Sequence, residues 1–336
     1  MYRTALLPGH SSSVNRSLTV TAQKDVPLSG YTRFGIGGPA DVLIDAATED
    51  DFRAAINDVR KSGRPVVVIG GGTNLVVSDE GFRGTVIRYT ANRIGGEGTL
   101  VTAEAGAVLQ DLVDFTIDHS LAGIHTMTGI PGWVGGAVYG NAGAYGRSIH
   151  QSVKSVRFFD GEAVREFNNA ECQFHYRDSI FKHRKEWIIF STTLELTSGN
   201  GAELRSKAEG IWNVRNEKYP PTMKCAGSIF KNLLFAELPE SVQRQVPPEL
   251  VREGKVPSAY FLELVDAKGM KNGDIHVADY HANLIYNAGQ GTAQQVCEVI
   301  DDLKSRVRAR FGFDVEEEVQ YVGFTSSADR SGSRRA

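Results

Sequence analysis

Apolar residues recur at helical spacing in four stretches of the chain. In residues 49–62, Phe52, Ile56 and Val59 share one face, Thr48 can cap the start and Gly63 can end the helix. A second helix is predicted from Leu109, Leu112, Val113 and Ile117, with Gly123 as its end. A third is predicted over residues 203–218, before Pro220 and Pro221. The fourth has its apolar face at Val296, Ile300, Leu303 and Val307, between a Thr292/Gln295 capping box and Gly312.

The stretch VIGGGTNLVVSDEGFRG, from Val68 to Gly84, is predicted to be a glycine loop between two strands. It is not a dinucleotide fingerprint, because the sixth position counted from Gly70 is Leu75, and it lacks the lysine of a P-loop. Consecutive N–H groups without β-carbons can converge on an anion, and Thr73 and Asn74 add donors. A tight turn without a ligand is the alternative interpretation of this loop alone.

Composition narrows the class of protein. The 336 residues are 41% hydrophobic and 23% charged, which is enough for a substantial core and two or more domains. The net charge of −3 and the lack of a long basic run argue against nucleic-acid or membrane-surface binding. The three separated cysteines form no metal pair or disulfide framework and favour the cytoplasm. We expect no membrane-spanning segment or secretory signal, and flexible tails at residues 1–20 and 325–336.

A second glycine-rich stretch, GIPGWVGGAVYGNAGAYG from Gly129 to Gly146, strengthens the case for a ligand. It has seven glycines in eighteen residues. Each glycine in place of alanine costs roughly 0.5–1 kcal/mol in regular structure, so two such tracts are easier to explain if backbone lies against a large flat ligand. A pyrophosphate-linked dinucleotide meets that requirement.

Seven motifs, in order, resemble those of the UDP-N-acetylenolpyruvoylglucosamine reductase family. They are YTRFGIGGPADVL, VIGGGTNLVVSDEGFRG, GIPGWVGGAVYGNAGAYG, YRDSIFK, CAGSIFKN, YHANLIYN and EEEVQYVG, and they run from about Lys24 to Gly323. The resemblance implies an α/β (α+β) chain with a FAD-binding fold of the vanillyl-alcohol-oxidase or PCMH type, made of two α/β subdomains, and a C-terminal α+β substrate domain. With the boundary near Tyr219, it implies a FAD-binding domain at 21–218 and a substrate-binding domain at 219–324.

The resemblance also implies a reaction and its residues. In the family, NADPH reduces FAD, and hydride then passes to the enolpyruvyl double bond of UDP-N-acetylglucosamine enolpyruvate, giving UDP-N-acetylmuramate. The chemistry requires a carboxylate contact, stabilisation of an enolate-like intermediate and a proton donor. Arg177 matches the arginine that contacts the carboxylate, Glu318 the glutamate beside it, and Ser228 the proton donor. Alone, each has a more ordinary interpretation: a surface ion pair, a solvated charge run and a turn hydroxyl.

The binding residues follow from the same motifs. Tyr176, Lys218 and Asn232 match substrate-binding positions, although Tyr176 could equally be a core aromatic. No metal is predicted, because the histidines lack partners at ligand spacing. We expect small-molecule partners and a monomer. The residues expected to bind FAD are Gly70, Gly71, Gly72, Thr73, Asn74 and Leu75 in the first loop, and Gly129, Ile130, Pro131, Gly135, Gly136, Ala137, Asn141, Gly143, Ala144 and Tyr145 in the second.

The chain also departs from the family pattern. It resembles the branch that lacks a tyrosine-bearing substrate loop between Lys182 and Lys218, and the stretch of residues 233–257 is longer than usual. Gln320 replaces a frequent arginine, and Thr73 a frequent serine. Two other functions stay open: a FAD-dependent oxidase of the same fold, which would not need AGSIFKN or Glu318, and a non-catalytic FAD-binding module.

Overall fold

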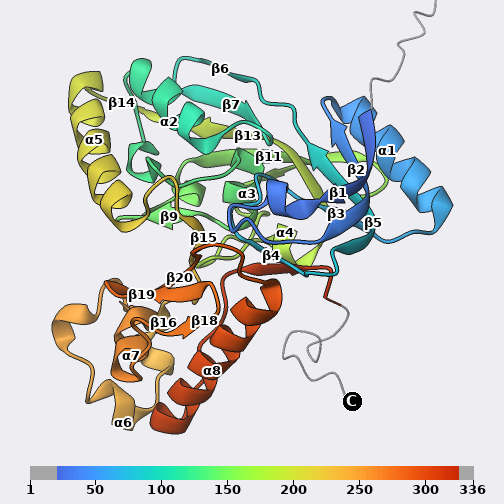
Figure 1. The fold of residues 1–336 in the computed structure, drawn as a ribbon. Helices are drawn as coiled ribbons and strands as arrows, with labels where there is room; N and C mark the ends of the chain where they lie inside the picture. The colour runs from blue at the N-terminus through green and yellow to red at the C-terminus, as the bar shows by residue number, and fades with distance from the viewer. Residues whose placement is uncertain (1–20, 325–336) are drawn as a thin grey trace, which may run out of the picture.

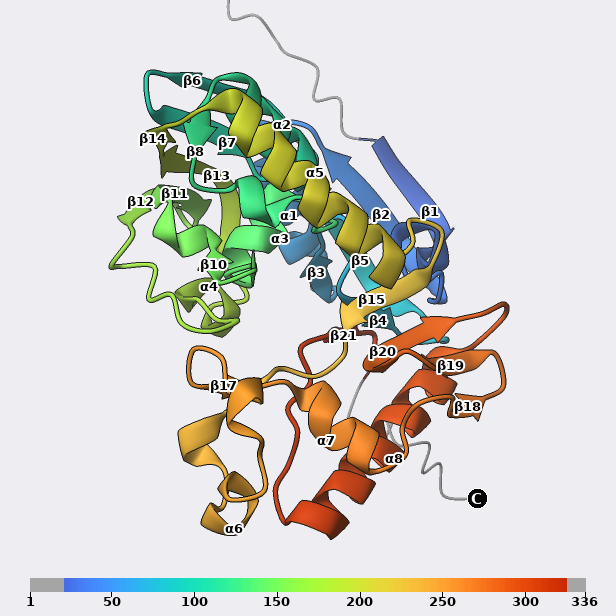
Figure 2. The ribbon, with the colours of Figure 1, turned by 90° about the vertical axis from the view of Figure 1, so that its left-hand side faces the viewer.

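A computed structural model describes residues 21–324, which form two parts that lie one above the other in Figure 1. The upper part contains residues 21–218, and the lower part contains most of the remainder. Figure 2 shows the same division from the side, with β4 (Leu75–Val77) and β21 (Gln320–Val322) at the junction. The tails predicted at 1–20 and 325–336 lie outside the described residues.

The first sheet of the upper part has the strand order β1-β2-β5-β3. Its strands β2 and β3 run parallel to β5, whereas β1 is antiparallel to β2. Helix α1 packs against it and confirms both predicted end signals, because Thr48 accepts a hydrogen bond from the Asp51 N–H and Gly63 is left-handed. The bounds are β1 (Thr21–Pro27), β2 (Pro39–Ala46), α1 (Glu49–Ser62), β3 (Val66–Val68) and β5 (Phe82–Tyr89).

The second sheet of the upper part is antiparallel throughout, in the order β12-β11-β13-β7-β6. It shares one apolar core with the first sheet, in which Phe52, Tyr89 and Phe190 contact one another. Helix α2 ends at Asp118 and not at the predicted Gly123, because Ser120 already turns left-handed. The bounds are β6 (Ile94–Glu97), β7 (Leu100–Glu104), α2 (Leu109–Asp118), α3 (Val134–Tyr139), β11 (Val153–Phe159), β12 (Val164–Asn168), β13 (Ile188–Glu195) and α5 (Gly201–Lys218).

The lower part is built on an antiparallel sheet with the order β15-β20-β19-β18, which α7 and α8 cover. Helix α8 begins at the predicted Thr292/Gln295 capping box and ends at the left-handed Gly312, as predicted. The bounds are β15 (Lys224–Ser228), α7 (Ser258–Leu264), β18 (Lys271–Asn272), β19 (Ile275–Ala278), β20 (His281–Asn287) and α8 (Ala293–Phe311).

The two parts are joined by strand pairing and by a shared core. Strand β21 runs parallel to β4, the strand that follows the first glycine loop. Phe34, Ile36 and Val76 of the upper part belong to the apolar core that β19, β20 and α8 form. The C-terminal end of the described chain therefore lies beside the first glycine loop.

Residues 233–257 fold as short elements around a small apolar core of Leu238, Val242, Val246, Val256 and Phe261. None of the helices in residues 21–324 is long and apolar enough to cross a membrane. The remaining bounds are η1 (Leu28–Tyr31), β8 (Leu121–Ala122), η2 (His125–Met127), β9 (Gly143–Ala144), β10 (Arg147–Ser148), η3 (Ile149–Gln151), α4 (Ile180–His183), β14 (Thr197–Ser198), β16 (Leu233–Leu234), η4 (Phe235–Glu237), α6 (Glu240–Gln243), η5 (Pro248–Leu250) and β17 (Lys255–Val256).

Candidate active site

Backbone pairing brings three distant segments of the chain together. The Glu318 N–H donates to the carbonyl of Ile229, 2.7 Å away, so Glu318 lies beside the residue that follows Ser228. The Asn74 side chain donates to the Glu318 carbonyl at 3.0 Å, and the Gln320 N–H donates to the Asn74 carbonyl at 2.9 Å. The first glycine loop, Ser228 and Glu318 are therefore held in register by the fold itself.

Asn283, in the motif YHANLIYN, fixes the backbone after Ser228. Its side chain is buried, accepts from the Phe230 N–H at 2.9 Å and donates to the Phe230 carbonyl at 2.8 Å. It also donates to the hydroxyl of Ser258. Because a buried amide that satisfies both groups of one residue fixes that residue's orientation, Asn283 holds the stretch that carries Ser228 and Asn232 in place.

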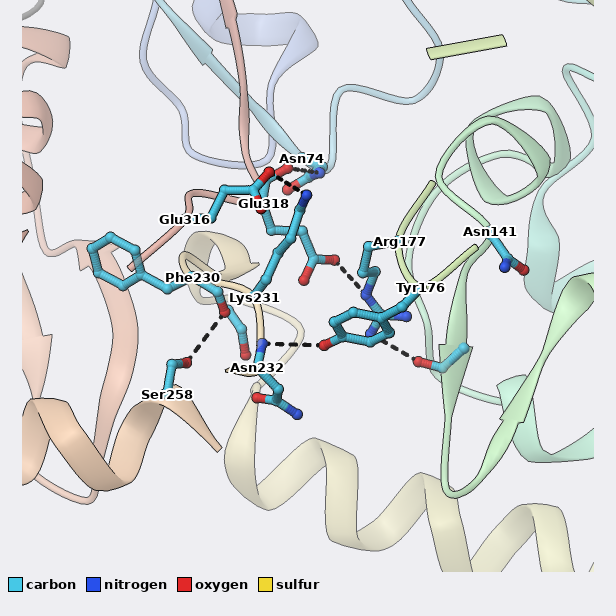
Figure 3. A network of polar contacts seen from close by, with 12 residues as sticks. Asn74, Asn141, Tyr176, Arg177, Phe230, Lys231, Asn232, Ser258, Glu316 and Glu318 are labelled. Atoms are coloured by element: carbon cyan, nitrogen blue, oxygen red, sulfur yellow. Dashed lines mark hydrogen bonds and ion pairs between the residues drawn. The ribbon is translucent and has the colours of Figure 1, made fainter. Parts of the chain in front are cut away.

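Arg177 and Glu318 face each other across the junction of the two parts, as Figure 3 shows. Arg177 Nε lies 2.8 Å from Glu318 Oε1, but its N–H has no aligned hydrogen-bond acceptor within the described residues. Arg177 Nη2 donates to the Gly143 carbonyl at 3.0 Å. The contact with Glu318 is therefore an ion pair that leaves donor capacity for an incoming carboxylate.

The backbone of Arg177 is left-handed, with φ of 56°, which is uncommon for a residue with a β-carbon. Lys182 Nζ donates to the Arg177 carbonyl at 2.7 Å. Burial lowers the pKa of Lys182, and the nearby Lys231 lowers it further. We infer that Lys182 holds the unusual turn that directs the arginine.

The three glutamates of EEE have three different cationic partners. Glu316 pairs with Lys231, Glu317 with Lys304, and Glu318 with Arg177. The Glu316 side chain is 72% exposed, whereas those of Glu317 and Glu318 are 10% and 22% exposed. The run is therefore only partly the solvated surface that its composition alone suggests.

The Tyr176 side chain lies between Arg177 and the long stretch of residues 233–257. Its hydroxyl accepts a hydrogen bond from the Asn232 N–H at 3.1 Å, and burial raises its pKa. Its ring lies 5.4 Å from the Arg177 guanidinium carbon and 5.0 Å from Lys255 Nζ. Lys255 was not among the predicted site residues, and it comes from a turn at Glu253 and Gly254, both left-handed.

Ser228 closes β15, and its hydroxyl lies 3.2 Å from that of Tyr219. The Tyr219 ring is flanked by two cations of α5: the Arg215 guanidinium carbon is 5.6 Å and Lys218 Nζ is 5.3 Å from the ring centroid. Lys218 was among the residues predicted for the site from the sequence, whereas Arg215 and Tyr219 were not. The i, i+3 spacing of Arg215 and Lys218 on one helix was an available signal.

The first glycine loop has consecutive backbone N–H groups that are free to donate hydrogen bonds. None of the backbone N–H groups from Gly70 to Asn74 donates to another group of the described chain. A β-carbon at Gly70 would meet only Trp133, at 3.9 Å, so the space beside it is open. Unpaired N–H groups beside open space fit a pyrophosphate.

The predicted FAD residues fall into two groups by what surrounds them. Gly136 also faces open space, whereas a β-carbon at Gly72 or Gly135 would strike protein within 2.8 Å. Asn141 is buried and donates to the carbonyl of His175, so its side chain holds backbone together. Thr73 donates to the carbonyl of Pro131 and links the two glycine stretches. Leu75 starts β4, Gly129 contacts Arg215, Ala137 is buried in α3, Gly143 and Ala144 form β9, and Tyr145 is 52% exposed.

Three buried polar atoms near the second glycine stretch lack a partner within residues 21–324: His125 Nδ1, Thr126 Oγ1 and Arg215 Nε. Arg215 lies against Gly129, where a β-carbon would come within 3.1 Å of it. Burial lowers the pKa of both His125 and Arg215. Buried groups without partners are costly, so they are expected to meet a polar ligand, and the site fits a bound FAD. In the described chain, no group of three His, Cys, Asp or Glu side chains could hold a metal.

We expect Gly136→Val to weaken FAD retention without unfolding the protein. The added side chain would enter the open space beside α3, whereas valine on a helix costs only about 0.5 kcal/mol relative to alanine. Gly210→Val is the matched control, because Gly210 is also helical and a β-carbon there would meet nothing within 4 Å. Flavin absorbance after gel filtration measures retention, and equal loss in both variants would contradict the assignment.

Comparison with known proteins agrees with this geometry. Residues 40–165 match the family described as FAD binding domain, and residues 219–322 match UDP-N-acetylenolpyruvoylglucosamine reductase, C-terminal domain. A UDP-N-acetylenolpyruvoylglucosamine reductase of Solibacter usitatus is 61% identical over 91% of this chain and 98% of the relative. One from Rubrobacter xylanophilus is 35% identical over 94% of this chain and 99% of the relative.

A solved structure supports the same assignment. The crystal structure of UDP-N-acetylenolpyruvylglucosamine reductase (MurB) from Thermus caldophilus superimposes with a TM-score of 0.71 at 27% identity, and the match covers 90% of this chain and 98% of that one. The predicted α/β FAD-binding fold is confirmed. The extent of these matches shows that the chain belongs to the UDP-N-acetylenolpyruvoylglucosamine reductase family.

Proposed function

We propose that the chain reduces the enolpyruvyl double bond of UDP-N-acetylglucosamine enolpyruvate to give UDP-N-acetylmuramate, with NADPH as electron donor. Bound FAD would supply the hydride chemistry that links NADPH to the substrate. The N–H groups of Gly70 to Asn74 and the unpartnered groups of His125, Thr126 and Arg215 would hold this cofactor. Side chains of the protein are proposed to carry out the remaining steps.

Arg177 is proposed to bind the substrate carboxylate. Its planar fork suits two-point contact, and the Gly143 carbonyl and Glu318 already hold the guanidinium at a fixed place. Hydride addition at the outer carbon leaves negative charge on the carbon that bears the carboxylate. A cation at that carboxylate stabilises the charge as it develops, which is the main requirement of this reaction.

Ser228 is proposed to deliver the proton to that carbon. Glu318 is proposed to hold the guanidinium of Arg177 beside the substrate carboxylate, so that Arg177 can stabilise the enolate-like intermediate. The support is that these residues converge: the Glu318 side chain contacts Arg177, and the Glu318 N–H donates a hydrogen bond to the carbonyl of Ile229, the residue after Ser228. This convergence is the observation on which the proposal rests. An oxidase of the same fold would have no need of it.

The substrate nucleotide is proposed to lie between the two parts of the molecule, with Lys218, Asn232 and Tyr176 as contacts. Lys218 can act as a point charge on phosphate. Tyr280 donates to the Lys218 carbonyl at 2.8 Å and so fixes the end of α5. Since one chain supplies all these residues, we propose that the protein acts as a monomer. We propose that it works in the cytoplasm, where UDP-sugars and NADPH are found, and that it takes part in the synthesis of peptidoglycan precursors for the cell wall.

An anaerobic flavin spectrum tests the function. NADPH should bleach the flavin, and the enolpyruvyl UDP-sugar should then restore its absorbance while UDP-N-acetylmuramate forms. Bleaching by an alcohol or sugar, with no response to the enolpyruvyl substrate, would indicate the oxidase. A protein that stays colourless after FAD addition would contradict both enzymes.

We expect Glu318→Gln to lose less activity than Glu318→Ala. Glutamine keeps an oxygen that can face Arg177 and a group that can donate to a substrate carboxylate, whereas alanine leaves the guanidinium without its partner. Steady-state kcat and KM for the enolpyruvyl substrate measure the difference.

The matched control for Glu318 is Glu316→Gln. Glu316 also pairs with a cation, Lys231, but its side chain is 72% exposed, so we expect activity close to that of the parent. A Glu318→Ala variant as active as Glu318→Gln would show that the side-chain amide contributes nothing.

A further inference from the structure

The Tyr219 hydroxyl is the one hydrogen-bond partner of Ser228 Oγ within residues 21–324, at 3.2 Å. Its ring packs against the buried cluster of Cys225, Ala278 and Leu284, which fixes the direction of the hydroxyl. Neither the FAD contacts nor the substrate contacts described above use this tyrosine. The hydrogen bond therefore requires an explanation of its own.

A serine that donates a proton needs one back. When the Ser228 Oγ–H bond breaks and a C–H bond forms on the substrate, an alkoxide remains on Oγ. An aliphatic alkoxide is a strong base, whereas a phenol ionises near pH 10 and can therefore supply the missing proton. Tyr219 is within hydrogen-bonding distance of that oxygen.

We propose that Tyr219 is a positioning residue that orients the Ser228 hydroxyl and returns a proton to it during turnover. The Tyr219 Oη–H bond breaks as the Ser228 Oγ–H bond reforms, and the phenolate then takes a proton from solvent. The net transfer is one solvent proton to the substrate carbon, with no additional oxidant or reductant. This inference rests on the proposed role of Ser228 as the proton donor.

The surroundings of Tyr219 suit both states of the phenol. Burial raises its pKa, so the residue is protonated and able to donate at physiological pH. Arg215 and Lys218, the two cations beside the ring, stabilise the phenolate during its short life. The pKa of the neighbouring His281 falls to about 4, chiefly by burial, so its ring is neutral and is not a competing acid. The titratable and polar groups that face Tyr219 are Arg215 and Lys218 of α5, Cys225 and Ser228 of β15, Tyr280 and His281 at the start of β20, and Glu318.

Tyr219→Phe keeps the ring and removes only the hydroxyl. We expect flavin reoxidation by the enolpyruvyl substrate to slow by about tenfold, the effect of losing one aligned hydrogen bond, while flavin reduction by NADPH stays within about twofold of the parent. Tyr286→Phe is the matched control, because Tyr286 packs on the same cluster but its hydroxyl faces His276. A rate for Tyr219→Phe equal to that of the control would overturn the proposal.

A fluorinated tyrosine at position 219 separates proton return from packing. Its ¹⁹F resonance reports the ionisation of the phenol directly, and fluorine lowers the pKa of the phenol. Because the neutral phenol is the active form, reoxidation should fall as pH rises through that pKa, and the alkaline limb should move to lower pH with fluorination. If the alkaline limb of the reoxidation rate does not follow the phenol pKa measured by ¹⁹F titration, the proposed proton return by Tyr219 is overturned.

Variants at Ser228 distinguish this proposal from the function on which it depends. If Tyr219 acts through Ser228, adding Tyr219→Phe to Ser228→Ala should cause no further loss. If Ser228→Ala itself reoxidises flavin at nearly the parent rate, the donor assignment fails and this inference fails with it. If Ser228→Ala is slow but Tyr219→Phe matches its control, only the role of Tyr219 is refuted.

Discussion

Ser228→Ala is expected to slow the reoxidation of reduced flavin by the enolpyruvyl substrate at least ~100-fold, because a positioned proton donor contributes ~10²–10⁴-fold. FAD binding and flavin reduction by NADPH should stay nearly intact, since the Ser228 hydroxyl is bonded to Tyr219 and to no other group of the described chain. Stopped-flow absorbance of the two half-reactions, measured separately, checks both statements.

Two further variants define the meaning of that result. Ser228→Cys should recover little activity, because the longer bonds of sulfur displace the proton. Ser206→Ala, on the exposed side of α5, should leave both half-reactions unchanged. A Ser228→Ala enzyme within ~10-fold of the parent reoxidation rate would rule out the donor role, since that loss is smaller than a positioned acid provides.

The local parts of the fold could be predicted because their signals lie within a few residues. The capping residues Thr48 and Thr292 and the stop residues Gly63 and Gly312 act over one turn of helix, and the structure has them where the sequence indicates. The predicted end of α2 was wrong because Ser120 takes the left-handed turn that was assigned to Gly123, three positions later.

The composition of the candidate site was predicted less evenly. The sequence predicted Arg177, Ser228 and Glu318 because each lies in a motif of the family. The fold brings these residues together, although the first and last are 141 positions apart. Tyr219, Arg215 and Lys255 lie outside the quoted motifs, and only tertiary packing brings them to the site. Tyr219 follows the end of α5, and Ser228 lies nine residues later at the end of β15, so their contact has no helical or strand periodicity that a sequence pattern could reveal.

The glycines illustrate the same limit. Both glycine-rich stretches suggested backbone close to a ligand, yet a β-carbon at Gly72 would strike the carbonyl of Tyr31, while one at Gly136 would meet nothing within 4 Å. A glycine needed for close packing and one that faces a ligand are identical in sequence. Only the neighbours of each position separate the two roles.

Arg177→Lys is expected to reduce turnover of the enolpyruvyl substrate by a factor on the order of 10²–10³, the effect of losing one aligned donor to developing charge. The guanidinium contacts Glu318 through Nε and the Gly143 carbonyl through Nη2, which leaves one nitrogen and the remaining protons for the substrate. A lysine has a single nitrogen on a flexible stem, so it cannot keep both contacts and also bind a carboxylate at two points.

The half-reactions again separate chemistry from folding. NADPH should still bleach the flavin of Arg177→Lys, because the change keeps the positive charge and the Lys182 contact to the backbone carbonyl of residue 177. Arg306→Lys, in a surface ion pair with Asp302 on α8, should behave like the parent in both half-reactions. Equal losses in the two half-reactions of Arg177→Lys would point to a disturbed fold or flavin site and would refute a specific role for the guanidinium at the substrate carboxylate.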